Sequence, residues 1–190
     1  MYFPLKEKPK ESYHEAPRNF GARRSHGKRK HAGCDLYAPV GTGVYAVADG
    51  TVVAAYPFYL GTWAVEVNHG DFVVRYGEVQ PKVAPGIRAG ARIGVGADIG
   101  TIGRLEGLTI SMLHFEMYAG TATGALTVRG GKGKFAAYQR RDDLLDPTSF
   151  LDEALMLSGR LEGAAPPLRG IMKSPIGGMH FIKNCFPVEA

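Results

Sequence analysis

The stretch TWAVEVNHGDFVVRYGEV, residues 62–79, decides the fold. Its two ends, Thr62–Asn68 and Phe72–Val79, are rich in Val, Trp and Tyr, which favour β-strands. Asn68-His69-Gly70-Asp71 lies between them and has the composition of a tight turn. The stretch therefore predicts a β-hairpin.

Further short apolar segments lie on both sides of this hairpin. Val44–Val47 and Gly50–Ala55 precede it, and Ile110–Tyr118 follows it. Gly accounts for 26 of the 190 residues, about twice its usual ~7% share, and Pro adds 12. So many turn residues argue against a helical bundle, and the sequence predicts a mainly β protein built from short strands.

The composition divides the chain into three parts. Residues 1–17 are polar without periodicity, which predicts a poorly ordered or surface-wrapping N-terminal arm. Residues 18–145 hold the expected strands and form the predicted β domain. Residues 146–190 are predicted to hold one short helix followed by an apolar tail, to which the sequence assigns no role.

The start of that helix has a clear signal. Asp146 is a good N-cap, and Pro147 suits the first helical position. Apolar side chains follow at helical spacing, and Gly159 is expected to end the helix. These side chains are Phe150, Leu151, Ala154 and Leu155.

Positive charge is concentrated at the beginning of the chain. Lys plus Arg is 23 and Asp plus Glu is 18, a formal net charge of +5. Nine of the basic residues and three of the acidic ones fall within residues 1–30, so the rest of the chain is close to neutral. This basic segment suits nucleic acid, an anionic surface or an anionic polymer, or it is a solvated strand or tail. No aromatic-interleaved or zinc-finger pattern supports specific nucleic-acid binding.

No apolar run approaches the ~20 residues of a membrane-spanning helix. The N-terminus has no apolar signal core, so we expect a protein that stays in the cytoplasm or is exported without a classical signal peptide. Cys34 and Cys185 are too few for a disulfide scaffold. One long-range bridge is possible in principle, but two buried thiols are the favoured interpretation.

The first group with chemical potential is His31-Ala32-Gly33-Cys34-Asp35. Side chains alternate between faces in an extended segment, so His31 and Asp35 share a face and Gly33 leaves open space between them. Cys34 points the other way and is excluded as a co-ligand. One imidazole and one carboxylate on a shared face make half of a zinc site, although such pairs are usually unrelated.

The second group is Met112-Leu113-His114-Phe115-Glu116 within a predicted strand. Alternation points Leu113 and Phe115 toward the core, and Met112, His114 and Glu116 to the other face. A lone histidine on a strand is usually a structural polar residue, but next to the His31/Asp35 pair it would supply a third ligand. Three protein ligands with an open fourth position are typical of catalytic zinc.

In combination these motifs resemble the lysostaphin-type (LytM-type) zinc metalloendopeptidases, which cut peptide cross-bridges in bacterial peptidoglycan. That family carries a His-x-x-x-Asp motif and a later His-Leu-His-Phe-Glu motif. Here Phe20-Gly21-Ala22-Arg23 precedes the first motif, as Phe-Gly-x-Arg does in the family, and residues 38–52 resemble its next strand pair. The hairpin turn at 68–71 and a Gly-spaced stretch at 87–94 follow in order, so the resemblance covers roughly residues 19–118.

The resemblance implies a small antiparallel β-sheet or barrel-like body with an open groove. It also implies one Zn²⁺ per chain, held by His31, Asp35 and His114, and peptidoglycan as the partner. Arg23 is expected in the substrate groove, where the basic segment would face an anionic wall polymer. Without a classical signal, a phage lysis protein or a secreted effector acting at the cell wall or periplasm is expected. The oligomeric state and the bond cut are not indicated.

Two residues depart from the family pattern. Tyr76-Gly77-Glu78-Val79 matches a Tyr-Ala-His-Leu segment, so Glu78 replaces a catalytic histidine, and Met112 replaces the first histidine of the later motif. Our hypothesis is that Glu78 is the general base, as glutamate is in His-Glu-x-x-His enzymes. Arg75, Tyr76 or His69 would supply the hydrogen bond that Met112 cannot donate, and alternation favours Tyr76, which shares the face of Glu78, over Arg75. Met112 would then form a wall of the groove.

Two functions therefore remain open. The leading one is a zinc endopeptidase that cleaves peptidoglycan stems or cross-bridges through a metal-activated water. The alternative is a metal-binding but catalytically impaired peptidoglycan-binding or regulatory module, which the replaced histidines favour and the intact ligands oppose. Glu78 as a merely solvated carboxylate also stays open, as does Glu116 as a structural partner of the site.

Overall fold

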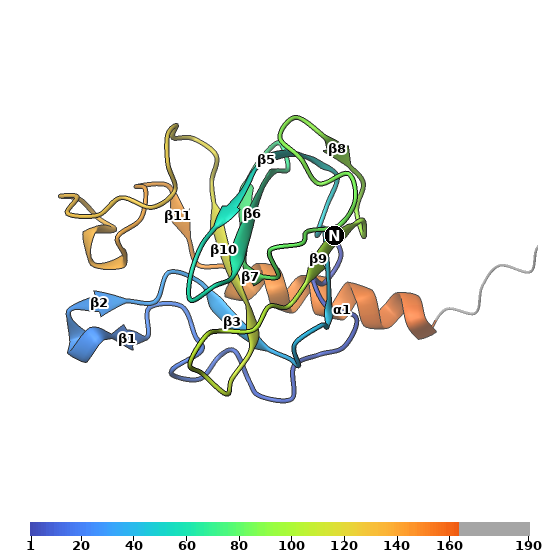
Figure 1. Ribbon diagram of the computed structural model, residues 1–190, viewed down its shortest axis with the longest axis horizontal. Coiled ribbons are helices and arrows are strands. Elements are labelled where there is room, and N and C mark those ends of the chain that lie inside the picture. The colour runs from blue at the N-terminus through green and yellow to red at the C-terminus, as the bar shows by residue number, and fades with distance from the viewer. Residues whose placement is uncertain (164–190) are drawn as a thin grey trace, which may run out of the picture.

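The structure, a computed structural model, describes residues 1–163. Its centre is a seven-stranded antiparallel sheet with the order β11-β10-β7-β6-β5-β8, in which β3 also pairs with β10 (Figure 1). The strands are β3 (Cys34–Tyr37), β5 (Gly50–Pro57), β6 (Trp63–Asn68), β7 (Val73–Val79), β8 (Arg92–Ile93), β10 (Met112–Tyr118) and β11 (Leu144–Leu145). The predicted mainly β, antiparallel fold is confirmed.

The smaller elements lie around this sheet. The short hairpin of β1 (Arg23–Arg24) and β2 (Arg29–Lys30) encloses the 3₁₀ turn η1 (Ser25–Gly27), and β4 (Gly43–Tyr45) pairs with β9 (Asp98–Thr101). A second 3₁₀ turn, η2 (Ala136–Tyr138), lies in the long connection between β10 and β11. The helix is α1 (Thr148–Gly163).

The predicted hairpin is formed by β6 and β7, which pair Val65 with Tyr76 and Val67 with Val74. These side chains are fully buried on one face of the sheet and join the main core. Because side chains alternate, the neighbouring positions Glu66, Arg75 and Glu116 form a row across three strands on the other face. The sheet thus separates an apolar core face from a face that carries charged groups.

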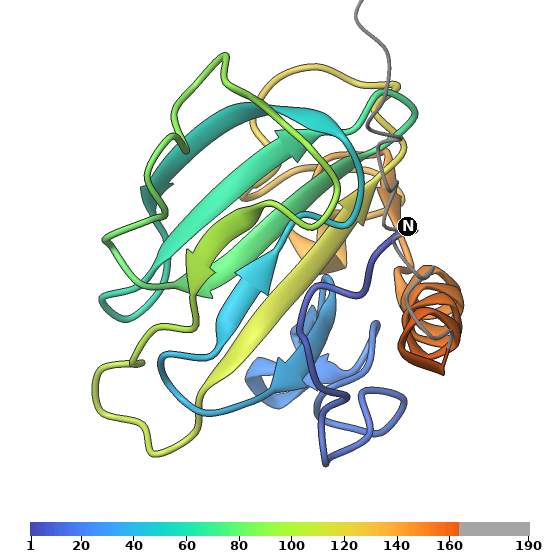
Figure 2. The same ribbon diagram turned by 90° about the vertical axis from the view of Figure 1, so that its right-hand side faces the viewer.

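Helix α1 and the N-terminal arm cover the core face. The Leu151 and Ala154 side chains are fully buried there, while the β1–β2 hairpin projects from the other side of the sheet (Figure 1). The arm runs in front of the sheet, close to α1, as Figure 2 shows. Its Tyr13 hydroxyl donates to Asp152 Oδ1 at 2.6 Å, and Phe3 and Leu5 are buried. Residues 1–17 therefore wrap the body.

Helix α1 begins as its sequence indicates but ends later. Asp146 Oδ1 accepts hydrogen bonds from the Thr148 N–H at 2.9 Å and the Thr148 hydroxyl at 2.6 Å, an N-cap arrangement. The prediction that Gly159 ends the helix is wrong, because α1 continues to Gly163. A glycine inside a helix costs only about 1 kcal/mol relative to alanine and does not by itself stop it. The predicted apolar tail and Cys185 lie outside the described residues; Cys34 is buried.

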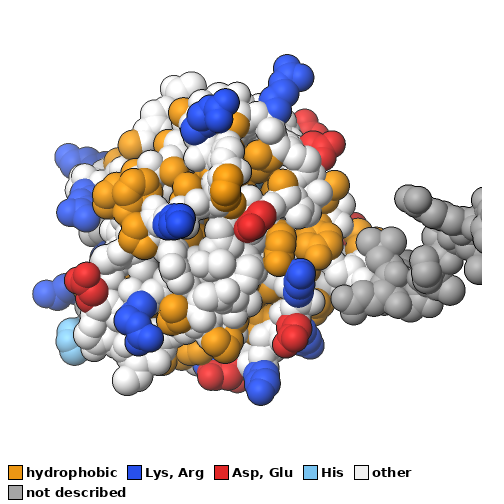
Figure 3. Space-filling model, turned by 45° about the vertical axis from the view of Figure 1, so that its right-hand side comes forward, with side chains coloured by type: hydrophobic (Ala, Val, Ile, Leu, Met, Phe, Trp, Pro, Cys, Tyr) orange, Lys and Arg blue, Asp and Glu red, His pale blue; other side chains and the backbone are white. Residues whose placement is uncertain are grey.

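No helix within residues 1–163 is long and apolar enough to cross a bilayer. On the face drawn in Figure 3, the Lys and Arg side chains are scattered rather than gathered into one patch. A concentration of basic residues is found instead at the β1–β2 hairpin, on the side of the sheet that carries the candidate site.

Candidate metal centre

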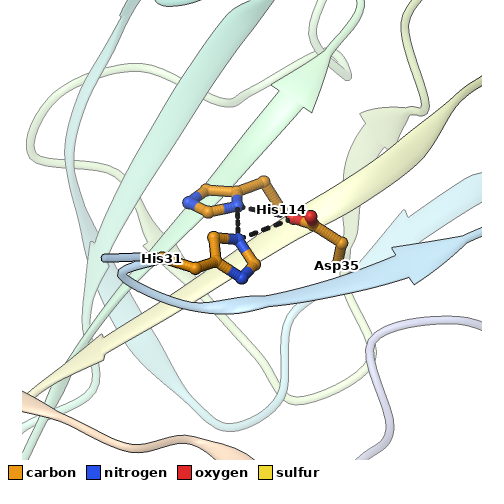
Figure 4. Close-up of side chains that lie close together, drawn as sticks. All are labelled: His31, Asp35 and His114. Atoms are coloured by element: carbon orange, nitrogen blue, oxygen red, sulfur yellow. Dashed lines mark hydrogen bonds and ion pairs between the residues drawn. The ribbon is translucent and has the colours of Figure 1, made fainter. Parts of the chain in front are cut away.

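Three predicted ligands converge on the charged face of the sheet (Figure 4). Asp35 on β3 is the direct cross-strand partner of His114 on β10, and His31 lies in the turn between β2 and β3. His31 Nε2 is 3.0 Å from Asp35 Oδ1 and 3.1 Å from His114 Nδ1, and His114 Nδ1 is 2.8 Å from Asp35 Oδ1. All three side chains are buried. The structure therefore brings together the His31, Asp35 and His114 set that the sequence predicted.

The donor atoms suit zinc in type and in spacing. Two imidazole nitrogens and one carboxylate oxygen are a ligand set found in zinc enzymes. Ligand atoms arranged tetrahedrally about 2.0–2.2 Å from a zinc ion lie about 3.3 Å from one another. The separations of 2.8–3.1 Å are only slightly shorter, so small side-chain shifts would admit the ion.

Gly33 controls how closely the two ligand-bearing segments approach. A Cβ atom at this position would lie 2.2 Å from the carbonyl oxygen of Phe115 and 2.9 Å from its carbonyl carbon. The prediction that Gly33 leaves open space between His31 and Asp35 is wrong, because the β10 backbone fills that space. Gly33 is instead the residue that allows the His31 turn to pack directly against β10.

Hydrogen bonds fix the tautomer of each histidine. His31 Nδ1 lies 2.8 Å from the carbonyl oxygen of Asn19, and His114 Nε2 lies 2.8 Å from Glu116 Oε1. Each of these nitrogens donates its proton to the oxygen, and the other ring nitrogens, Nε2 of His31 and Nδ1 of His114, point at Asp35 Oδ1. Metal-binding histidines are commonly oriented in this way by a carbonyl or carboxylate. Glu116 is thus a partner of a ligand and lies on the face that the sequence predicted.

Glu116 is itself held in a buried ionic network. Its carboxylate accepts from Arg75 Nη1 at 2.9 Å, from Arg140 Nη2 at 2.6 Å and from the Tyr118 hydroxyl at 2.5 Å. Arg75 also pairs with Glu66 at 3.1 Å. Because both the Arg75 and the Glu116 side chains are almost fully buried, each charge depends on the others for stabilisation. The network keeps Glu116 ionised and therefore fixes the orientation of His114.

The charges at the centre are strongly coupled. Burial alone would raise the pKa of Asp35, but hydrogen bonds from His114 and His31 hold it well below its usual range. Burial alone would lower the pKa of His114, but its hydrogen bonds to Asp35 and Glu116 raise it to about 10. For His31 burial prevails and lowers the pKa. The Asp35 carboxylate thus stabilises positive charge at His114, where a metal cation would replace the proton.

Glu78 reaches the same site through an irregularity in β7. Trp63 pairs with Val79 and Ala64 pairs with Gly77, so Glu78 is an extra residue between two paired positions. Its φ of +63° lies in the left-handed region, which turns its side chain out of the regular alternation. Glu78 therefore lines the cleft together with His114.

The Glu78 carboxyl is buried and only partly satisfied. Its Oε2 atom has no hydrogen-bond partner among residues 1–163. Burial raises the pKa of Glu78 to about 7, with a smaller opposing effect from the charge of His114. A carboxyl group in this state can take up a proton close to neutral pH.

Tyr76 does not lie in the site. Its ring is fully buried on the core face, where its hydroxyl accepts from the Val47 N–H at 3.0 Å and lies 3.1 Å from His69 Nε2. The prediction that Tyr76 shares a face with Glu78 and assists catalysis is therefore wrong. Strict alternation fails at the bulge, which moves Glu78 to the opposite face. His69, predicted as a turn residue, is held by the Asp49 carbonyl at 3.0 Å and does not line the cleft.

The ligands lie in a cleft of about 760 Å³. Met112 and Arg23 line it, as predicted, and Met112 presents a thioether where the family pattern has a histidine. Arg24 also lines the cleft, and its Nη2 atom donates to Asp35 Oδ2 at 3.0 Å. The remaining histidines with described side chains, His14 and His26, lie outside the cleft, and His180 lies outside the described residues.

The comparisons with known proteins agree with this geometry. The model of "Peptidase family M23" matches residues 29–125, just over half of the chain, and this span contains His31, Asp35, Glu78, Met112 and His114. The chain belongs to peptidase family M23. The predicted resemblance to the lysostaphin-type peptidases is confirmed.

A curated relative is the peptidoglycan DD-endopeptidase ShyC of Vibrio cholerae serotype O1 (strain ATCC 39315 / El Tor Inaba N16961). It is 33% identical over 103 residues, which cover 52% of this chain and 23% of ShyC, so the chain spans about a quarter of that relative's length.

Two solved structures of lysostaphin from Staphylococcus simulans share the fold. The whole peptidase has a TM-score of 0.56 at 20% identity, covering 81% of this chain and 56% of lysostaphin. Its catalytic domain has a TM-score of 0.52 at 21% identity, covering 70% of this chain and 89% of the domain.

Two features of this M23 site were not predicted from the sequence. Arg24 is the basic residue that contacts a ligand, whereas the sequence motif pointed to its neighbour Arg23. Adjacent residues of a strand point to opposite sides, so only one of the two could face Asp35, and local sequence does not say which. Arg140 lies 24 residues after Glu116, and no sequence signal linked the two.

Proposed function

We propose that this M23 chain is a zinc-dependent endopeptidase that hydrolyses amide bonds in peptidoglycan peptides. The observation that carries the proposal is the convergence of His31, Asp35 and His114 at a cleft, with Nε2 of His31 and Nδ1 of His114 both within 3.0 Å of Asp35 Oδ1. Zinc held by three protein ligands supplies a Lewis acid with an open coordination position, at which water becomes nucleophilic near neutral pH.

We assign the role of general base to Glu78. Its buried carboxyl lines the cleft beside His114, has an unpartnered oxygen and can take up the proton that the attacking water loses. This is the role that the sequence hypothesis gave it, although Glu78 reaches the site through the bulge in β7 rather than through regular alternation.

Other residues position the reacting groups. Arg24 holds Asp35 through its second carboxylate oxygen, and Glu116 holds His114 in the tautomer that presents Nδ1 to the site. The positive charge of Arg24 also acts to lower the pKa of Glu78. We assign to Arg24 the stabilisation of negative charge that develops on the scissile carbonyl, a role in place of the one predicted for Tyr76.

The relative named a peptidoglycan DD-endopeptidase supports a cell-wall substrate. We therefore propose peptidoglycan as the partner and the cell wall or periplasm as the place of action. We include in this proposal that the domain belongs to a phage lysis protein or a secreted effector. The location of the protein in producing cells tests this part of the proposal.

A second function is favoured by one observation. Among the described residues that line the cleft, the histidines are the ligands His31 and His114, and Met112 offers no proton. A metal-binding module with impaired catalysis would explain why the catalytic histidines of the family pattern are replaced here. It would bind peptidoglycan without cutting it.

The two functions are separated by incubating the zinc-loaded full chain with purified peptidoglycan and analysing new amino termini by mass spectrometry. If the chain is a peptidase, new amino termini appear, and they disappear when the metal is chelated or when Asp35→Asn replaces the wild type. The kcat of Glu78→Gln then falls by about 10²–10⁴-fold. If the chain is a binding module, no new termini appear at any pH, and Glu78→Gln binds the cell wall as well as the wild type does. Zinc affinity of each variant, measured in parallel, shows whether the centre itself is intact.

A further inference from the structure

The cleft around the metal centre has two chemically different parts. One part, here called the apolar wall, consists of Phe58, Tyr59, Leu105, Leu108, Ile110 and Met112. Tyr59 is 53% exposed and Leu108 and Ile110 are each 43% exposed, values that are high for large apolar side chains. The two loops of this wall are joined by a hydrogen bond from the Glu106 N–H to the Leu60 carbonyl.

The other part, here called the basic wall, consists of Arg23, Arg24, Arg29, Lys30, Arg129 and Arg140. The β1–β2 hairpin and the segment after Thr127 build it together. Lys30 Nζ lies 5.6 Å from the centre of the Tyr138 ring, and Arg29 lies 3.4 Å from Gln139. Against these six cations, the cleft lining contains two carboxylates, Asp35 and Glu78.

Two of the six cations have internal partners. Arg24 is bound to Asp35, and Arg140 is bound to Glu116. The other four form no ion pair with a carboxylate of residues 1–163. Arg18 and Arg141 elsewhere on the surface pair with Glu11 and Asp143, and Arg88 and Arg92 also form no ion pair among the described residues, but the four cations of the basic wall are gathered at one cleft. Four like charges at one cleft repel one another unless an anion joins them.

We propose that the basic wall is a carboxylate-binding subsite, which selects peptides with a free carboxylate close to the scissile amide. Arg23, Arg29 and Arg129 are its exposed guanidinium groups, of which Arg29 contacts Gln139, and a guanidinium matches a carboxylate through two parallel hydrogen bonds. The apolar wall receives an aliphatic side chain of the same peptide. The occupant is thus an anionic stem peptide rather than an uncharged glycine bridge or an amidated stem.

This inference rests on the proposed peptidase function. It adds that the bound peptide carries a negative charge near the bond that is cut. A neutral peptide would leave four cations of the basic wall without counter-ions. A peptide carboxylate would bind them without disturbing the Arg24–Asp35 and Arg140–Glu116 pairs that hold the metal centre. The subsite should therefore affect KM more than kcat.

The test uses two fluorescent cross-linked stem peptides that differ only in amidation of their free carboxylates. Their affinities for the zinc-loaded full chain carrying Glu78→Gln are measured by anisotropy at low salt, so that cleavage does not interfere. KM and kcat are measured with the wild-type chain. The Arg23→Gln/Arg129→Gln double variant tests the basic wall, and Arg88→Gln/Arg92→Gln, which removes two exposed charges outside the cleft, is the matched control.

We expect amidation to weaken binding and to raise KM by about tenfold, the range of two partly exposed ion pairs. The Arg23/Arg129 variant should lose most of this preference, with Arg29 and Lys30 still in place, while the control should keep the wild-type preference. Equal binding of the two peptides by the parent chain would overturn the proposal. So would an equal loss in the Arg88/Arg92 control, which would mean a general attraction for anions.

Failure of the proposed function has a different signature. If the wild-type chain cleaves neither peptide, the peptidase proposal fails, and the anisotropy comparison, made with the Glu78→Gln chain, still decides whether a carboxylate subsite exists. Thermal unfolding of both double variants, expected to match the parent because all four positions are exposed, verifies that each one is folded.

Discussion

Replacing Gly33 with alanine should disable the metal centre without touching a ligand. The added Cβ would lie 2.2 Å from the Phe115 carbonyl oxygen, about 1 Å closer than real Cβ atoms approach backbone oxygens. Because the obstacle is backbone of a central strand, the His31 turn must move away from β10 by about this distance. Zinc ligands tolerate displacements of only about 0.2 Å. His31 would then no longer meet Asp35 and His114.

Two measurable changes follow for Gly33→Ala. Overpacking of this kind costs about 1–3 kcal/mol of folding stability, and the rigidity of the backbone obstacle places this case near the upper end. Zinc affinity should fall by at least the 10–100-fold that is typical when partners of metal ligands are lost. Stability is measured by urea unfolding of the metal-free chain, and zinc affinity by competition with a chromogenic chelator.

Gly94→Ala is the matched control for this experiment. Gly94 also has an ordinary φ, but the nearest atom to its added Cβ is Asp49 Oδ1 at 3.8 Å, which is normal contact. Its substitution should be neutral or stabilise the chain by up to about 1 kcal/mol through the unfolded state. If Gly33→Ala bound zinc with wild-type affinity and matched Gly94→Ala in stability, the close packing of the His31 turn on β10 would be refuted.

Three further perturbations test other parts of the structure. Glu116→Gln leaves Arg75 and Arg140 without their shared buried counter-ion, so the free energy of unfolding should fall by about 3–5 kcal/mol in urea titrations; a loss below about 1 kcal/mol would contradict the network. Saturating zinc at about 1,000 times its Kd should stabilise the wild-type chain by about 4 kcal/mol, seen as a rise in Tm that chelation reverses, and an unchanged Tm would exclude a metal site present only in the folded state. Asp146→Ala removes the cap of α1 and should cost about 1 kcal/mol, whereas an equal cost for exposed Ser149→Ala would show that capping is not the cause.

The sequence alone determined the features that depend on local patterns. The β6–β7 hairpin followed from strand-forming residues around a turn sequence, and the start of α1 followed from Asp146 and Pro147. The candidate ligands His31, Asp35 and His114 were predicted because each lies in a short motif whose spacing and order match the family. Strand alternation also placed Glu116 correctly beside His114.

Only the tertiary structure decided how these parts meet. Alternation placed Glu78 on the same face as Tyr76, but the bulge in β7 puts the two side chains on opposite faces. The sequence did not reveal the bulge, because an extra residue on one strand is recognised only when its partner strand is known. Gly33 was interpreted as open space, yet the backbone of β10 fills it, a contact between residues 82 positions apart. Arg140 joins Glu116 through the same kind of long-range packing. Side-chain environments of this sort depend on strand pairing across the whole sheet, and no local stretch of the sequence encodes them.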